Sequence, residues 1–120
     1  MVNMGFKFNY DREYDVLYIS NAEQEVEESI EVSEDIVLDL NKEDNVIGIE
    51  IFYASEFFGA FNNQVNKEFL KSLEEARLEY KEFRNQWFIV VILKNKNATI
   101  YQPMPPLRRS EYTSPLIMNS

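Results

Sequence analysis

Three aspartates in the first third of the chain, Asp11, Asp15 and Asp39, are the side chains best suited to binding a metal ion. Hard cations such as Mg²⁺ prefer oxygen ligands, and a few carboxylates brought together by a fold can hold one ion. The chain has no histidine and no cysteine, so an enzyme built on these residues would depend on carboxylates. One hypothesis is therefore a carboxylate-only, Mg²⁺-dependent enzyme.

The local sequence favours a structural role for these aspartates. Asp11 lies in the turn sequence Tyr10-Asp11-Arg12-Glu13, and Asp15 precedes an apolar strand. Aspartate side chains in turns accept hydrogen bonds from nearby backbone N–H groups. The missing histidine removes the usual general base near neutral pH, and the missing cysteine excludes thiol nucleophiles, disulfides and sulfur ligands. We therefore expect a non-enzymatic protein without a cofactor.

Two groups of residues are candidates for contact with another protein. Glu25, Glu27 and Glu31 lie on one face of an expected strand, as a solvated surface or as a docking surface for a small basic protein. Phe57 and Phe58 belong to an aromatic cluster suited to core packing or to contact between two copies. The leading functional hypothesis is a protein-binding or self-associating domain that forms a homo-oligomer.

Nucleic-acid binding by the second half of the chain is the alternative. Residues 1–61 hold 15 acidic and 3 basic side chains, whereas residues 62–120 hold 6 acidic and 9 basic ones. The net charge of −9 disfavours binding to phosphate, so only the second half is a candidate. An aromatic ring among positive charges is typical of nucleic-acid surfaces. The residues concerned are Trp87, Lys94, Lys96, Arg108 and Arg109.

The hydrophobic pattern predicts an α+β domain over residues 1–102. Alternating and continuous apolar runs predict an antiparallel β-meander of about five strands, near residues 6–9, 16–19, 25–32, 36–40 and 46–53. Apolar residues spaced by threes and fours predict one long amphipathic helix over about 63–84, packed on the sheet. A further hairpin is expected at 87–102. Residues 103–120, which contain all four prolines, are expected to form an extended strap or tail.

No run of about 18 apolar residues is present, so we expect no membrane span. The first residues lack the basic patch and apolar stretch of a signal peptide, which predicts a cytoplasmic location.

Residues from about 8 to 55 resemble a family of small prokaryotic proteins called domain of unknown function 2283. The resemblance rests on five short segments and leaves the rest of the chain uncovered. It implies an antiparallel sheet followed by a helix, without catalytic residues to transfer. Genes of such proteins often lie beside those of small toxin-like proteins, so the resemblance also implies an antitoxin role. The segments are Tyr10-Asp11, Asp15-Val16-Leu17-Tyr18-Ile19, Ile36-Val37-Leu38-Asp39, Ile47-Gly48-Ile49-Glu50-Ile51 and Ala54-Ser55.

Overall fold

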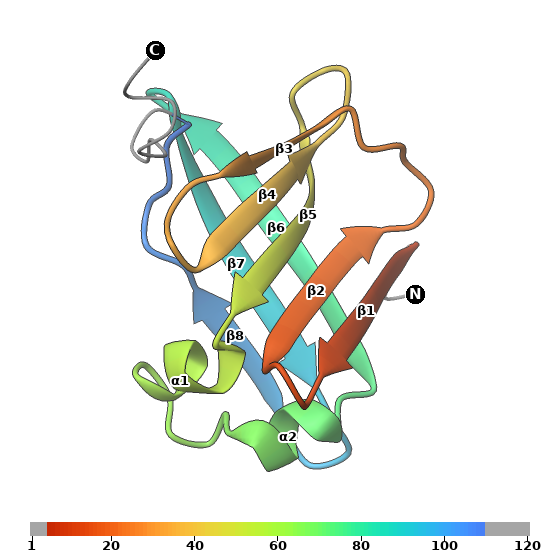
Figure 1. Ribbon diagram of the computed structural model, residues 1–120, viewed down its shortest axis with the longest axis vertical. Coiled ribbons are helices and arrows are strands. Elements are labelled where there is room, and N and C mark those ends of the chain that lie inside the picture. The colour runs from red at the N-terminus through yellow and green to blue at the C-terminus, as the bar shows by residue number, and fades with distance from the viewer. Residues whose placement is uncertain (1–4, 110–120) are drawn as a thin grey trace.

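The computed structural model describes residues 5–109, which form two antiparallel sheets and two short helices (Figure 1). The α+β class and the antiparallel five-stranded sheet are confirmed. Sheet A contains β1 (Phe6–Asp11), β2 (Val16–Asn21), β3 (Glu28–Glu31), β4 (Ile36–Leu40) and β5 (Val46–Phe52). The chain continues through α1 (Ala54–Gly59) and α2 (Lys67–Lys71). Sheet B contains β6 (Glu75–Phe83), β7 (Gln86–Lys94) and β8 (Thr99–Pro103).

Sheet A is not the predicted meander. Its strand order is β1-β2-β5-β4-β3, so β2 to β5 form a Greek key. The strands β2 and β5 pair at the centre, where Leu17 lies opposite Ile51 and Ile19 opposite Ile49. All four of these side chains are fully buried. The short β3 is exposed apart from Ile30 and therefore occupies an edge, where one side of its backbone can face water.

The prediction of one long helix over residues 63–84 is wrong. Asn66 does cap a helix, since its Oδ1 accepts the Phe69 N–H at 2.9 Å, but α2 ends at Lys71. The chain then enters β6, where Ala76 and Leu78 are buried and alternate with outward charged residues. A helical spacing and a strand alternation coexist in this segment. The strand forms because the apolar β7 needs a hydrogen-bonded neighbour on each side, and β8 supplies only one of them.

A tight turn joins β6 to β7. Phe83 pairs with Gln86, and the two residues between them, Arg84 and Asn85, both have positive φ angles of 55° and 64°. Two consecutive left-handed residues are typical of a type I′ turn, whose twist matches that of a hairpin. The predicted hairpin of β7 and β8 is present, with β6 added as its third strand.

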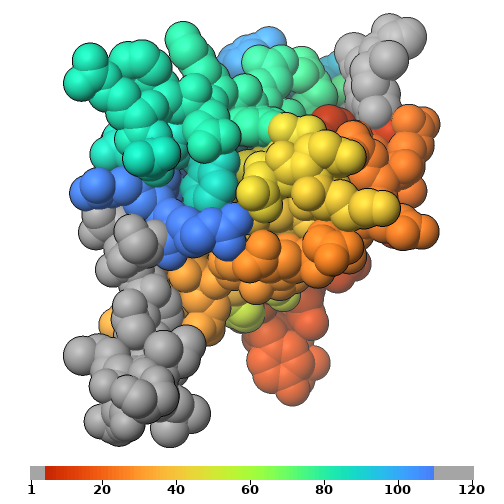
Figure 2. All heavy atoms as spheres, turned by 90° about the horizontal axis from the view of Figure 1, so that it is seen from above, coloured from red at the N-terminus to blue at the C-terminus, as the bar shows by residue number. Residues whose placement is uncertain are grey.

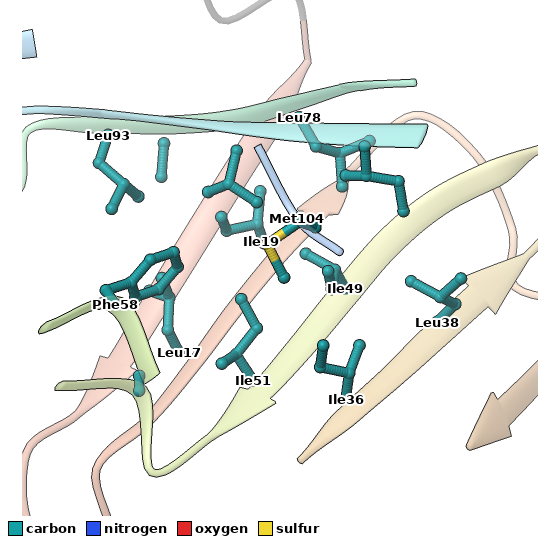
Figure 3. Close-up of a cluster of buried hydrophobic side chains, with 14 of the residues drawn as sticks. Leu17, Ile19, Ile36, Leu38, Ile49, Ile51, Phe58, Leu78, Leu93 and Met104 are labelled. Carbon is teal, nitrogen blue, oxygen red and sulfur yellow. The ribbon is translucent and has the colours of Figure 1, made fainter. Parts of the chain in front are cut away.

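The core lies between the two sheets (Figure 3). Sheet A directs isoleucine and leucine side chains toward Leu78 and Leu93 of sheet B, with Met104 between them. Phe58 of α1 is fully buried and closes one end of this core, the end at which both helices lie (Figure 1). One hydrophobic cluster thus joins both sheets and α1, including residues outside the predicted meander.

The described part of the predicted strap, residues 104–109, packs on the body of the protein. Leu107 and Trp87 exchange backbone hydrogen bonds of 2.8 and 3.1 Å, which extends the pairing along β7. Arg109 then reaches sheet A, where its guanidinium lies 2.9 Å from a carboxylate oxygen of Glu28. Figure 2 shows this blue segment between the β6–β7 hairpin and the orange part of sheet A. The strap therefore ties one open side of the sandwich together; residues 110–120 lie outside the described residues.

Candidate functional site

The outer face of sheet A, opposite the core, carries a hollow. Strand alternation turns every second side chain of β1, β2 and β5 outward, and the β2–β5 register places Val16 beside Phe52 and Tyr18 beside Glu50. The hollow has a volume of about 1010 Å³ and is open to solvent. It is therefore large enough to receive side chains of another molecule.

Acidic and aromatic side chains dominate this hollow, and no lysine or arginine among the described residues lines it. Tyr14 and Tyr53 are 68% and 60% exposed, unusually open for rings of this size. The surface thus combines negative charge with aromatic faces, the two features that attract a guanidinium or ammonium group. The carboxylates are those of Asp11, Glu13, Glu31, Glu34 and Glu50; the rings are those of Tyr14, Tyr18, Phe52 and Tyr53.

A polar network around one buried carboxylate lies beside the hollow, on the same face of sheet A. The Tyr18 hydroxyl donates to Asp39 Oδ2 and the Ser29 hydroxyl donates to Asp39 Oδ1, each at 2.6 Å. Asp39 is 7% exposed and sits beside Gly48, where a Cβ atom would lie 3.1 Å from Asp39 Oδ2 and 3.2 Å from the Ile19 carbonyl oxygen. Glycine at position 48 therefore makes room for the carboxylate, and the carboxylate fixes the ring of Tyr18.

Burial and the hydrogen bond to Asp39 raise the pKa of Tyr18 to about 12, from an ordinary value of 10. A group with a raised pKa in the folded state stabilises the fold while it is protonated in both states, which holds below pH 10. That contribution declines as the pH rises from 10 through 12. We expect the stability advantage of the natural protein over Tyr18→Phe to shrink across this interval, as measured by urea unfolding at a series of pH values. An advantage that is constant or grows with pH would contradict the assignment.

A second network fixes the start of α1. Asp15, 7% exposed, accepts the Tyr10 hydroxyl at 2.6 Å, the Ser55 hydroxyl at 2.7 Å and the Ser55 N–H at 3.1 Å. Its backbone oxygen also accepts the Ala54 N–H at 2.8 Å. Asp15 in the β1–β2 turn thus satisfies two N–H groups at the start of a helix about 40 residues later, Ser55 with its carboxylate and Ala54 with its backbone oxygen; neither N–H has a partner within that helix. Burial, followed by the hydrogen bond to Asp15, raises the pKa of Tyr10 well above its usual range.

The comparison with protein families bears on this half of the chain. Residues 7–55 match the family described as "Protein of unknown function (DUF2283)". The searches of curated proteins and of solved structures returned no match. The DUF2283 match covers sheet A and the start of α1, and leaves sheet B outside it.

The segments by which this chain resembles DUF2283 contain most members of the two networks. Tyr10, Asp15 and Ser55 form one, and Tyr18 and Asp39 belong to the other. In this chain, these residues hold the outer face of sheet A and its junction with α1.

The structure does not bring the three aspartates of the metal hypothesis together. Asp11 caps its own turn as predicted, since its Oδ1 accepts the Tyr14 N–H at 3.1 Å. Asp15 and Asp39 each bind a tyrosine and a serine hydroxyl in separate networks. Within residues 5–109, no three acidic side chains are grouped so as to hold a metal ion.

The candidate protein contacts are distributed over three places. Glu31 lines the hollow of sheet A, whereas Glu25 and Glu27 precede β3 and border a different, smaller hollow. Phe58 is fully buried in the core. Phe57 is half-buried and contacts the ring of Phe58 edge-on, with 5.5 Å between ring centroids.

The five residues of the nucleic-acid hypothesis do not form one surface. Trp87 is 5% exposed in the core, so its ring is unavailable for stacking on a base. Lys94 lies at the other end of β7 and approaches Glu75 to 3.8 Å, with Lys96 in the turn beyond it. Arg109 is paired with acidic side chains of sheet A, and Arg108 is an exposed neighbour in the strap.

Sequence reasoning missed most of the residues that line the hollow. The sequence does mark these residues as outward, because they alternate with buried residues along each strand; Tyr18, for example, stands between Leu17 and Ile19. However, only the pairing of β2 with β5 shows that Tyr18 and Glu50 are neighbours.

In the part of the chain that the structure describes, no helix is long and apolar enough to cross a membrane.

Proposed function

We propose that this protein is a protein-binding domain whose outer sheet A face receives a basic segment of another protein. The supporting observation is the hollow of about 1010 Å³, lined by five carboxylates and four aromatic rings and, in the part of the chain that the structure describes, by neither lysine nor arginine. A sheet face normally packs on something or is evenly covered by mixed charges; the lining of this hollow has a single sign of charge and exposed rings.

The chemistry of the hollow indicates which class of partner would bind there. A guanidinium group pairs with a carboxylate in a fork and stacks on aromatic faces, so arginine-containing segments fit best. The rings supply apolar contact area at low cost in side-chain entropy, and the carboxylates supply attraction at a distance. A small basic protein is the partner class, in keeping with the antitoxin role implied by the resemblance.

The test uses a labelled short peptide of alternating arginine and valine, with fluorescence anisotropy at low ionic strength as the readout. We expect the natural protein to bind it, and Glu31→Gln/Glu50→Gln to weaken binding about tenfold, because the removed charges line the hollow. A peptide of alternating glutamate and valine is expected not to bind.

Glu25→Gln/Glu27→Gln is the matched control. It removes the same amount of charge from a region outside the hollow, so we expect less than about a twofold change. Equal weakening by both double variants would mean that the peptide responds only to net charge and would overturn the proposal. Absence of binding to the natural protein would overturn it as well.

A further inference from the structure

Within residues 5–109, the outer face of sheet B is a second surface without a packing partner, and its character differs. The outward side chains of β7 are apolar along its middle: Phe88, Val90, which is half-buried, and Ile92, which is 4% exposed among its neighbours on this face. On β8 they are followed by Tyr101, which is 62% exposed and lies opposite Ile92. Phe88 is 39% exposed although it belongs to a regular strand. An apolar stripe on a regular sheet, bordered by charges, is typical of a contact surface.

Charge separates this face from the rest of the molecule. Its outward charged residues are two glutamates and three cations, although the chain as a whole carries −9. Two copies of so acidic a chain repel one another except where a face lacks that excess of negative charge. Sheet B offers such a face, whereas the hollow of sheet A is acidic. The charged residues are Glu75, Arg77, Glu79, Lys81 and Lys94.

The charged side chains of β6 are spaced so that two antiparallel copies of this strand would set opposite charges against one another. Glu75, Arg77, Glu79 and Lys81 alternate in sign on one face, while Ala76 and Leu78 between them point into the core. If a second copy stacks face to face about a two-fold axis perpendicular to the strands, β6 lies antiparallel over β6 of the second copy. With the axis at position 78, Glu75 meets Lys81 and Arg77 meets Glu79, each pair occurring twice.

The neighbouring strands agree with the same axis. The β6–β7 register places Leu78 opposite Val91, so the axis passes between Val90 and Ile92 on the outer face. Val90 of one copy then meets Ile92 of the other. The β7–β8 register sets Val91 opposite Gln102, so Tyr101 meets Pro103. The same axis sets Phe88 of one copy over Lys94 of the other, an aromatic ring against a cation. The three rows thus pair opposite charges on β6, apolar residues and a ring with a cation on β7, and Tyr101 with Pro103 on β8.

We propose that the outer face of sheet B is the interface of a symmetric homodimer, formed by stacking β6, β7 and β8 on the same strands of a second copy. This contact leaves the hollow of sheet A free, so the dimer presents two hollows on opposite sides. The inference is independent of what the hollow binds.

The test measures the mass of the full chain by sedimentation equilibrium over a range of concentrations. We expect twice the chain mass of 14.3 kDa. We expect Arg77→Glu to raise the dimer dissociation constant at least about tenfold, because it creates two like-charge contacts across the axis. The exposed pair that Arg77 makes with Glu79 in its own strand, at 2.9 Å, contributes little to folding, so the variant remains folded.

The charge-swapped variant Arg77→Glu/Glu79→Arg is the decisive control. It restores opposite charges both within the strand and across the axis, so dimerisation is expected to return to within about threefold of the natural protein. A monomer at all concentrations would overturn the proposal, as would a dimer indifferent to Arg77→Glu. Failure of the swap to restore a dimer lost in Arg77→Glu would overturn the proposed axis. Circular dichroism spectra of the three proteins establish that each is folded.

Discussion

Replacing Phe58 by alanine is expected to lower the free energy of unfolding by about 3–5 kcal/mol. Phe58 is fully buried and closes the end of the core where α1 meets the two sheets. Removing its ring takes away buried apolar area and leaves a cavity that the rigid sandwich fills only in part. Urea unfolding followed by circular dichroism measures the loss, with an unchanged denaturant slope showing that the unfolding transition remains the same.

Phe61→Ala is the matched control for this prediction. Phe61 is 54% exposed and contacts Phe57 with 5.5 Å between ring centroids, so its removal is expected to cost less than about 1 kcal/mol. The comparison separates the two roles that the aromatic cluster suggests in the sequence, core packing and contact between proteins. Equal, small losses in both variants would show that Phe58 is not the core residue that its burial indicates.

Asp15→Ala is expected to lower the free energy of unfolding by about 3 kcal/mol or more. The carboxylate accepts hydrogen bonds from one backbone N–H and two hydroxyl groups, and three donors lose their acceptor when it is removed. Asp15 also adopts a positive φ of 58°, which aspartate tolerates better than alanine does. The two effects add, because one concerns side-chain partners and the other the backbone.

Asp15→Asn separates these contributions. Asparagine accepts the left-handed backbone and keeps one acceptor oxygen, so its loss of stability is expected to be clearly smaller than that of alanine. Ser55→Ala, which removes only the 2.7 Å hydroxyl bond, is expected to cost about 1–2 kcal/mol. If alanine and asparagine at position 15 were equally stable, neither the network nor the backbone strain would matter as argued. Chemical unfolding of the three variants under identical conditions gives the comparison.

The outer face of sheet A and the outer face of sheet B divide the surface into two kinds. One is acidic, hollowed and aromatic; the other is apolar along its middle with alternating charges at its side. We propose a basic partner for the first and a second copy of the chain for the second. A dimer with both surfaces would hold two partner segments, one on each side. If the partner protein is itself a dimer, binding of its first segment raises the effective concentration of its second.

Strands with a strong local signal were predictable from the sequence. The runs at 16–19, 36–40 and 46–53 contain nearly continuous or alternating apolar residues bounded by turn residues, and all three are strands. The turn role of Asp11 was also predictable, because aspartate binds the backbone a few residues ahead without any help from the fold. The split of charge between the halves of the chain is a property of composition alone.

Residues 75–83 show why local pattern was insufficient elsewhere. Ala76, Tyr80 and Phe83 fit a helical stripe, while Ala76, Leu78 and Tyr80 fit a strand, so the periodicity alone admits both. The choice depends on β7, 86–94, which is too apolar to stand at an edge and needs a partner on each side. That requirement involves a separate segment of the chain, so the periodicity of residues 75–83 alone cannot reveal it.

By itself, the sequence determined the strand-rich first half, the aspartate-capped turn, the missing catalytic chemistry of histidine and cysteine, and the excess of acidic side chains. Only the tertiary structure decided which side chains meet. The Greek-key order sets Tyr18 beside Glu50 and brings Ser29 to Asp39, and the sandwich buries Trp87 and Phe58 while leaving Tyr14 and Tyr53 open. The physical reason is that strand alternation determines which face a side chain occupies, whereas its neighbours across the sheet depend on pairing between segments far apart in the chain.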